Sequence, residues 1–249
     1  MIPDYLPLLR VRHLGPIDDT AELQKCILAG LKERSITFYS TDREETTDIQ
    51  QLTERQLADL LSENQLVIVE DRLAPVNGEL VLGRHDPDTG NNEPASFYCR
   101  SRSDVDTCVA ELVGWIERCI RRTPVWGCVL VGGMSSRMGR PKHLIESENG
   151  QTWIENTVSL LRPHVSDVVL SGKGDIPAGL KGVERVSDLP GFQGTIWGIA
   201  SVLRKYPLVS FLVAACDMPT ITQQSIIWLL EQRRLGRKAV VPRNRESGW

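Results

Sequence analysis

The stretch VWGCVLVGGMSSRMGRPK, residues 125–142, decides the fold of the second half of this 249-residue chain. It begins with a continuous apolar run and then reaches two glycines, Gly132 and Gly133. An apolar run without polar alternation is typical of a strand that is buried on both faces of a parallel sheet. We therefore expect a buried strand that ends in a tight glycine turn.

Two similar apolar runs follow, VSDVVLSG at 165–172 and SFLVAACD at 210–217. Helical patterns lie between and after them, at residues 152–163, 195–206 and 223–234. Strands that alternate with helices of this length predict βαβ units. The predicted fold class is α/β with a doubly wound, mostly parallel, Rossmann-like sheet. Ligands of such sheets bind beyond the carboxyl ends of the strands.

The turn after the first predicted strand has the residues of a phosphate-binding loop. Gly132 and Gly133 let backbone amides approach phosphate oxygens without an intervening Cβ, while Arg137 and Lys142 add two cations. The spacing is neither that of a Walker A loop nor that of the Rossmann glycine motif. An ordinary strand-to-helix turn is the alternative, and the two cations favour phosphate binding.

Asp217 ends the run SFLVAACD, at the place where a buried strand meets the predicted ligand crevice. A carboxylate there suits Mg²⁺, which prefers hard oxygen ligands and commonly keeps waters beside one or two carboxylates. The alternative is an acid that begins a turn before Pro219. Asp217 is thus a candidate magnesium ligand.

The segment from Leu130 to Lys142 resembles the signature L-A-G-G-x-S-x-R-M-G-x-x-K of MobA-type nucleotidyltransferases, the molybdenum cofactor guanylyltransferase family. Val131 replaces the alanine, and the resemblance extends over residues 126–243. It implies that Arg137 neutralises the β and γ phosphates of a nucleotide and that Lys142 contacts the α-phosphate region. A family C-D-x-P strand end matches CDMP, which makes Asp217 the metal ligand.

The resemblance also implies two further site positions, around which this sequence differs from the family pattern. Asp188 precedes a turn whose glycines match Gly194 and Gly198, although Thr195 and Ile196 replace the family's proline and leucine. Ser171 stands where the family often has asparagine, and it offers fewer hydrogen bonds for reading a base. The implied nucleotide-binding residues are Leu130, Gly132, Gly133, Met134, Arg137, Lys142, Ser171, Asp188 and Asp217, with Arg137, Lys142 and Asp217 as the catalytic ones.

The resemblance implies transfer of GMP from GTP to the terminal phosphate of molybdopterin, with Mg²⁺ as cofactor and release of pyrophosphate. The implied partners are GTP, molybdopterin, and MobB-like or molybdoenzyme chaperone proteins. A cytidylyltransferase or a sugar-1-phosphate nucleotidyltransferase is an alternative, because related enzymes share much of the loop. A regulatory module that binds nucleotide without turnover is another. The regulatory module is considered because VVPRNRESGW stops where the family continues. We therefore expect a C-terminally short domain with poor turnover.

Residues 1–122 predict a smaller α/β domain that precedes the nucleotidyltransferase domain at 123–249. Strands are expected at 36–40, 66–70 and 79–83, and Ser103 with Asp106 predicts the capping box of a helix that ends before Pro124. The run QLVIVED (65–71) has a weak similarity to a strand of the MobB-like GTP-binding adaptor. That similarity implies a degenerate copy, since residues 1–122 contain no phosphate loop.

Charge and composition bear on the class of ligand and on the cellular location that we expect. Residues 1–122 carry 14 Lys and Arg against 22 Asp and Glu, a net charge of −8, and residues 123–249 carry 15 against 10, a net charge of +5. The basic half suits a phosphate-bearing ligand, and no basic run interleaved with aromatics indicates nucleic acid. No apolar run reaches the roughly 18 residues of a membrane span, and the start lacks a signal peptide, so we expect a cytoplasmic protein.

Cysteine and histidine usage gives two smaller expectations. The six cysteines contain no C-x-x-C pair, which predicts buried free thiols rather than a metal site. His143 lies beside Lys142 without an acid or a nucleophile at a telling spacing, and we interpret it as a surface or loop histidine.

Overall fold

The computed structural model describes residues 3, 5–14, 17–40, 54–69, 76–83, 95–132, 141–189, 194–218 and 220–242. The chain divides into two compact units. Unit 1 comprises Met1–Thr123 and Arg233–Ala239, and unit 2 comprises Pro124–Gln232 and Val240–Trp249. A short segment near the end of the sequence therefore belongs to unit 1. Among the described residues, no helix is long and apolar enough to cross a membrane.

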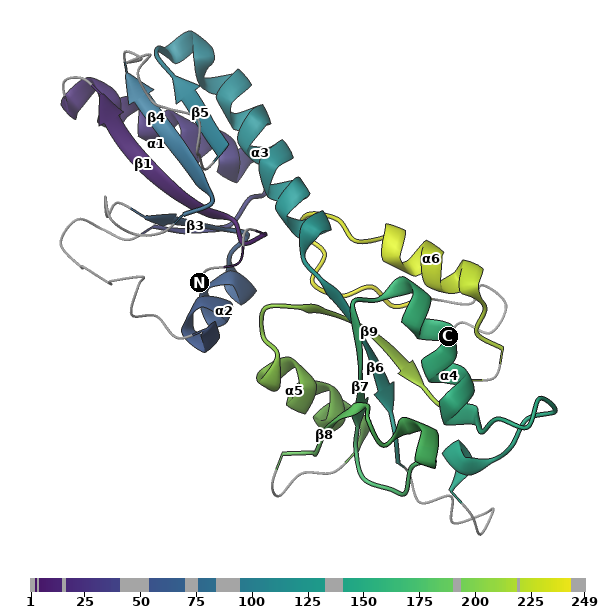
Figure 1. Cartoon of the computed structure of the whole chain (residues 1–249). Helices are drawn as coiled ribbons and strands as arrows, with labels where there is room; N and C mark the ends of the chain where they lie inside the picture. The colour runs from purple at the N-terminus through teal and green to yellow at the C-terminus, as the bar shows by residue number, and fades with distance from the viewer. Residues whose placement is uncertain are drawn as a thin grey trace. The chain divides into compact units, whose positions relative to one another are not determined.

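Unit 1 is built on a parallel sheet with the strand order β2-β3-β1-β4-β5 (Figure 1). Helices α1 and α3 bury their apolar faces in one core with the sheet, which includes Ile27, Leu80 and Leu112. The predicted strands correspond to β2, β3 and β4, whereas β1 and β5 were not predicted. The elements are β1 (Leu8–Leu14), α1 (Ile17–Glu33), β2 (Phe38–Ser40), α2 (Glu54–Glu63), β3 (Leu66–Val69), β4 (Gly78–Gly83), β5 (Ala95–Cys99), the 3-10 turn η2 (Arg102–Asp104) and α3 (Val105–Arg122).

The start of α3 differs from the prediction. The capping box is formed by Ser101 and Asp104, because a 3-10 turn precedes the helix and moves the first cap toward the N-terminus. The carboxylate of Asp104 accepts a hydrogen bond from the backbone nitrogen of Ser101 at 3.0 Å. The predicted pair of Ser103 and Asp106 was therefore wrong, whereas the helix ends before Pro124 as predicted.

The end of α3 is held by a residue that lies far away in the sequence. Nη2 of Arg233 donates to the carbonyl oxygens of Ile120 at 2.6 Å and Thr123 at 2.9 Å. The last carbonyls of a helix have no partner within the helix, so a guanidinium that reaches them replaces water there. Burial lowers the pKa of Arg233. This contact explains why the segment after α6 belongs to unit 1.

Unit 2 is built on a parallel sheet with the strand order β8-β7-β6-β9 (Figure 1). The chain runs outward from β6 through β7 to β8 and then returns to place β9 on the other side of β6. Ligand sites of open α/β sheets lie at such a reversal of strand order. The elements are β6 (Val125–Leu130), the 3-10 turn η3 (Lys142–Leu144), α4 (Trp153–Leu161), the 3-10 turn η4 (Arg162–His164), β7 (Asp167–Ser171), the 3-10 turn η5 (Ala178–Leu180), β8 (Glu184–Val186), α5 (Thr195–Lys205), β9 (Ser210–Ala215) and α6 (Gln223–Glu231).

Helices cover both faces of the sheet in unit 2. One core cluster joins Val158 of α4 and Ile226 of α6 to Val129 of β6. On the other face, Val202 of α5 packs with Cys128 of β6. Successive residues of β6 thus point to opposite helix layers, as a strand buried on both faces requires. The predicted doubly wound α/β fold is confirmed.

The register of the strands aligns the ends that were predicted to carry chemistry. Leu130 lies opposite Ser171 on β7 and opposite Ala215 on β9, while Ser171 lies opposite Val186 on β8. These four residues form one row across the sheet. Since the strands are parallel, the residues that follow the row leave the sheet at the same edge. Gly132, Asp188 and Asp217 each follow a member of the row by two positions.

Candidate active site

The carboxyl edge of this sheet brings Lys142 and Asp217 together. Lys142 begins the 3-10 turn η3, Asp217 follows β9, and Nζ of Lys142 lies 3.4 Å from Oδ2 of Asp217. Their side chains are 45% and 42% exposed. An exposed ion pair contributes about 0–1 kcal/mol to stability. Either group can therefore exchange its partner for a charged ligand at small cost to the fold.

The predicted metal ligand at this edge is a single carboxylate, that of Asp217. Within the parts of the chain that the structure describes, no three His, Cys, Asp or Glu side chains are grouped so that they could hold an ion. Mg²⁺ beside phosphates commonly binds one or two carboxylates, and water and phosphate oxygens complete its shell. The half-exposed carboxylate of Asp217 provides one such ligand.

Ser171 and Asp188 meet the start of α5 at the same edge. A Cβ at Gly198 would lie 2.8 Å from Oγ of Ser171 and 3.5 Å from Oδ1 of Asp188, so this close approach requires glycine. Ser171 is 1% exposed, and its Oγ has no hydrogen-bond partner among the described residues. A buried hydroxyl without a partner is costly and rare in proteins. The two predicted nucleotide contacts are thus brought together on the α5 side of the sheet.

The backbone beyond β6 and β7 is held by side chains that sequence reasoning did not assign to the site. Gly132 has a φ of 131°, a conformation that side chains rarely adopt. His143 is buried, and its Nε2 lies 2.8 Å from the carbonyl oxygen of Asp175, so Nε2 carries the proton. The interpretation of His143 as a surface or loop histidine was wrong about its exposure, because the loop after β7 covers the ring.

Arg185 of β8 holds the same loop from the other side. Its Nε donates to the carbonyl oxygen of Gly172 at 3.1 Å, and its Nη2 donates to that of Gly174 at 2.7 Å. The loop that follows β7 is thus fixed between a histidine and an arginine. Neither residue has a sequence signal, since each forms its contact through tertiary structure alone.

The structure describes one of the four remaining predicted site residues. Leu130 is half-buried at the end of β6 and packs on the α5 side. Gly133, Met134 and Arg137 lie outside the described residues, and their predicted contacts stay predictions.

Cys216 precedes Asp217 but is not suited to act as a nucleophile. Burial, and then the charge of Asp217, raise the pKa of its thiol to about 11. The thiolate is the reactive form of cysteine, so this side chain is unreactive near neutral pH. Cys216 is therefore not a candidate for a covalent intermediate.

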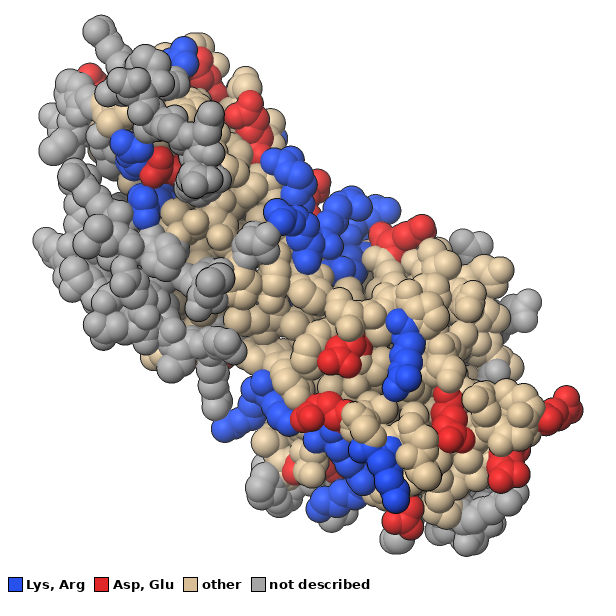
Figure 2. Space-filling model, in the orientation of Figure 1, with Lys and Arg blue, Asp and Glu red and all other residues tan. Residues whose placement is uncertain are grey.

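The surface charge of unit 2 does not indicate a ligand more strongly than these individual residues do. Figure 2 shows blue and red side chains interspersed over the described surface of unit 2 that faces the viewer. On this face, local groups such as Lys142 rather than a large field of one sign would attract an anionic ligand.

Comparison with known proteins matches part of this chain to a family. Residues 127–249, which include the strand ends described above, match the model of the "MobA-like NTP transferase domain". This part of the chain is a MobA-like NTP transferase domain. The matched residues do not include 65–71, so their similarity to a MobB-like strand stays a prediction.

Named relatives of the MobA-like domain agree with this assignment. The chain is 32% identical over 132 residues to a "Molybdenum cofactor biosynthesis bifunctional protein" of Synechocystis. The aligned residues make up 52% of this chain and 38% of that protein. It is 34% identical over 121 residues to a "Probable molybdenum cofactor guanylyltransferase" of Bacillus cereus, with 47% of this chain and 60% of that protein covered. The chain therefore spans less than two thirds of the length of these relatives.

A solved structure, Rv0371c from Mycobacterium tuberculosis H37Rv, also matches. It has 19% sequence identity and a TM-score of 0.35, over 44% of this chain and 60% of that one.

Proposed function

We propose that the MobA-like domain transfers GMP from GTP to the terminal phosphate of molybdopterin. The observation that carries this proposal is the pair of Lys142 and Asp217, 3.4 Å apart at the point where the strand order reverses. One group suits a phosphate and the other suits a divalent ion. Relatives named for molybdenum cofactor biosynthesis support the choice of substrates.

The proposed reaction is a displacement at the α-phosphorus of GTP. An oxygen of the acceptor's terminal phosphate forms a bond to this phosphorus, and the bond to the oxygen that bridges the α and β phosphates breaks. The electron pair of that bond leaves with pyrophosphate. Since the attacking phosphate oxygen is already ionised near neutral pH, the step needs no general base, and catalysis depends on position and charge neutralisation.

The residues at the strand ends divide this work. Lys142 exchanges its contact with Asp217 for the α-phosphate and neutralises charge that develops there. Asp217 would hold Mg²⁺, which when bound screens the phosphates and helps pyrophosphate to leave. Ser171 and Asp188, beside the start of α5, contact the nucleoside.

The proposal is tested with GTP that is labelled at its α-phosphate. Incubation with molybdopterin and Mg²⁺ is expected to move the label to the pterin product with one pyrophosphate per transfer. Lys142→Ala is expected to reduce this transfer, while Lys181→Ala, which removes an exposed lysine of the same domain, leaves it unchanged. Transfer from labelled CTP in preference to GTP would indicate a cytidylyltransferase instead.

A further inference from the structure

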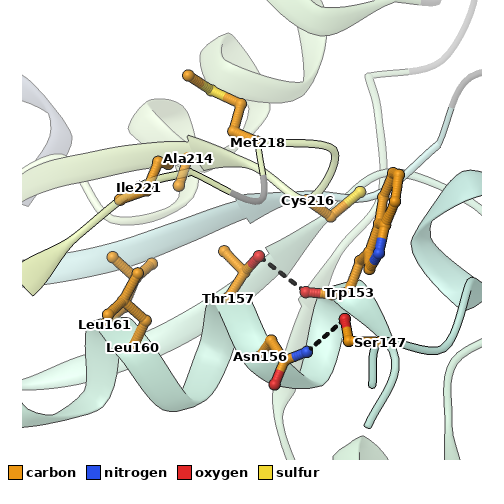
Figure 3. A pocket seen from close by; sticks show the side chains of 10 residues that line it. All are labelled: Ser147, Trp153, Asn156, Thr157, Leu160, Leu161, Ala214, Cys216, Met218 and Ile221. Carbon is orange, nitrogen blue, oxygen red and sulfur yellow. Dashed lines mark hydrogen bonds between the residues drawn. The ribbon is translucent and has the colours of Figure 1, made fainter. Parts of the chain in front are cut away.

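A cavity of about 280 Å³ lies between α4 and the segment that follows β9, and the reaction described above does not use it (Figure 3). Leu161 and Ala214 line its buried part with 1% and 5% exposure, and Met218, which is 51% exposed, lies at the open side. Sites for small molecules usually have about 300–1,000 Å³. The cavity therefore has room for one ring system but not for a whole nucleotide.

Both walls of the cavity continue from the segments that carry Lys142 and Asp217. Cys216 and Met218, which flank Asp217 in the sequence, line one wall. Trp153 lines the other, and its backbone nitrogen donates to the carbonyl oxygen of Ile145, just after the 3-10 turn of Lys142. A molecule in the cavity would thus lie beside the groups that we expect to bind the phosphates.

The cavity lies on the opposite face of the sheet from the proposed nucleoside contacts. Thr157 and Leu161 line it from α4, which packs on one face, whereas Ser171 approaches Gly198 of α5 on the other. A nucleoside held on the α5 side therefore leaves the cavity on the α4 side free for the second substrate.

The lining suits a flat heteroaromatic ring. The indole of Trp153 offers an aromatic face at one side of the cavity, and Met218 also belongs to the lining. The hydroxyl of Ser147 can donate to a ring nitrogen. The hydroxyl of Thr157 already donates to the carbonyl oxygen of Trp153 at 2.9 Å, so it can accept from a ring N–H. Nδ2 of Asn156 donates to Oγ of Ser147 at 2.9 Å, and Oδ1 of Asn156 accepts from Asn149 at 2.8 Å, so this polar wall is ordered before any ligand binds.

We propose that this cavity binds the pterin ring of the acceptor, with Trp153 as the stacking surface and with the acceptor's phosphate directed toward Asp217. The inference rests on the proposed function, because it names the place of the second substrate. It assigns Trp153, Thr157 and Ala214 to substrate recognition.

The test uses the full chain and neopterin monophosphate as the probe, with equilibrium dialysis read by pterin fluorescence. Ala214→Leu fills the buried part of the cavity, and Trp153→Leu removes the aromatic face. Each is expected to weaken binding by about tenfold or more, the scale of one lost aromatic contact with its packing. Trp153→Phe should restore most of the affinity. Trp228→Leu is the matched control, since Trp228 is a half-exposed tryptophan of α6 that does not line the cavity.

A separate titration with Mg·GTP distinguishes this inference from the proposed function. Ala214→Leu is expected to bind Mg·GTP as the unmodified chain does, which also shows that it is folded. Loss of pterin binding in both cavity variants with unchanged GTP binding supports the assignment. No pterin binding by the unmodified chain, or equal binding by Trp153→Leu, overturns it. If the pterin binds in the cavity but GTP does not bind at all, the proposed function fails and the cavity assignment stands.

Discussion

The ammonium group of Lys142 lies 3.4 Å from Oδ2 of Asp217, although the two residues are 75 positions apart in the sequence. The parallel pairing of β6 with β9 brings their segments to one edge of the sheet. Neither side chain is buried, so the pair is maintained by the backbone that positions it rather than by the attraction of its charges. Both charged groups are therefore accessible to a ligand.

Asp217→Asn is expected to change the free energy of unfolding by less than about 1 kcal/mol, because an exposed ion pair contributes little. The same variant should lose the magnesium dependence of GTP binding. Urea unfolding and titrations with Mg²⁺ or with a chelator check both parts. Asp167→Asn, at the opposite end of β7, is the control for nucleotide binding. A large loss of stability in Asp217→Asn would show that the carboxylate is structural.

Gly198→Ala is expected to destabilise the MobA-like domain by about 1–3 kcal/mol, since the added methyl group would crowd Oγ of Ser171. Ser171→Ala alone should be nearly neutral, because it removes a buried oxygen without a partner among the described residues. The double variant should recover much of the loss. Thermal unfolding of the four proteins gives the coupling energy, and strictly additive effects would rule out the predicted crowding.

Glu155 gives a prediction on acid stability. Its Oε2 accepts hydrogen bonds from the hydroxyl of Thr152 at 2.7 Å and from the backbone nitrogen of Thr152 at 2.9 Å, and these contacts lower the pKa of Glu155. Because its pKa is lower in the folded state, ionised Glu155 stabilises the folded protein. This stabilisation is fully present above the unfolded pKa, roughly 4.3, and is lost as pH falls through the folded pKa.

The comparison is between the unmodified chain and Glu155→Gln, which keeps an acceptor at the cap of α4 but removes the charge. The difference in their free energies of unfolding should be largest near neutral pH and should shrink as pH falls through the lowered folded pKa of Glu155. Urea unfolding across this range measures it. A difference that does not depend on pH would show that charge at the cap is irrelevant.

The cysteines should differ sharply in reactivity. Cys26 is partly exposed, whereas the other five are buried. Burial raises the pKa of Cys108 and Cys128 to about 12, and that of Cys216 to about 11. Iodoacetamide at about pH 8 should therefore modify Cys26 first, since only thiolates react. Peptide mass spectrometry identifies the labelled residue, and Cys26→Ser should remove the fast phase. Rapid labelling of Cys216 would contradict the packing around β9.

Much of the MobA-like domain could be predicted from the sequence because its central strands are buried on both faces. Such strands appear as unbroken apolar runs, as in β6, β7 and β9. Strand β8 has only three residues, two of them exposed, and leaves no apolar pattern to detect. Strands β1 and β5 were missed for a related reason, since charged or exposed positions interrupt both.

The candidate site was predictable to a different degree. Asp217 and Lys142 could be singled out by type and position, but their contact depends on the register of β6 and β9, which no local pattern reveals. The anchoring contacts of His143 and Arg185 are of the same kind. The contact of Arg233 with the end of α3 joins residues 113 positions apart and has no sequence signal at all.

The strand ends around Lys142 are proposed to bind a guanine nucleotide through its phosphates. The measurement that checks this binding is calorimetric titration of the full chain with Mg·GTP, Mg·CTP and Mg·ATP, repeated with Lys142→Ala and with Lys181→Ala as the control. We predict that Mg·GTP binds most tightly, and that Lys142→Ala weakens this binding by about 1.5–3 kcal/mol, the value of one charge-assisted contact. A preference for CTP or ATP, or equal affinity in Lys142→Ala, would contradict the account.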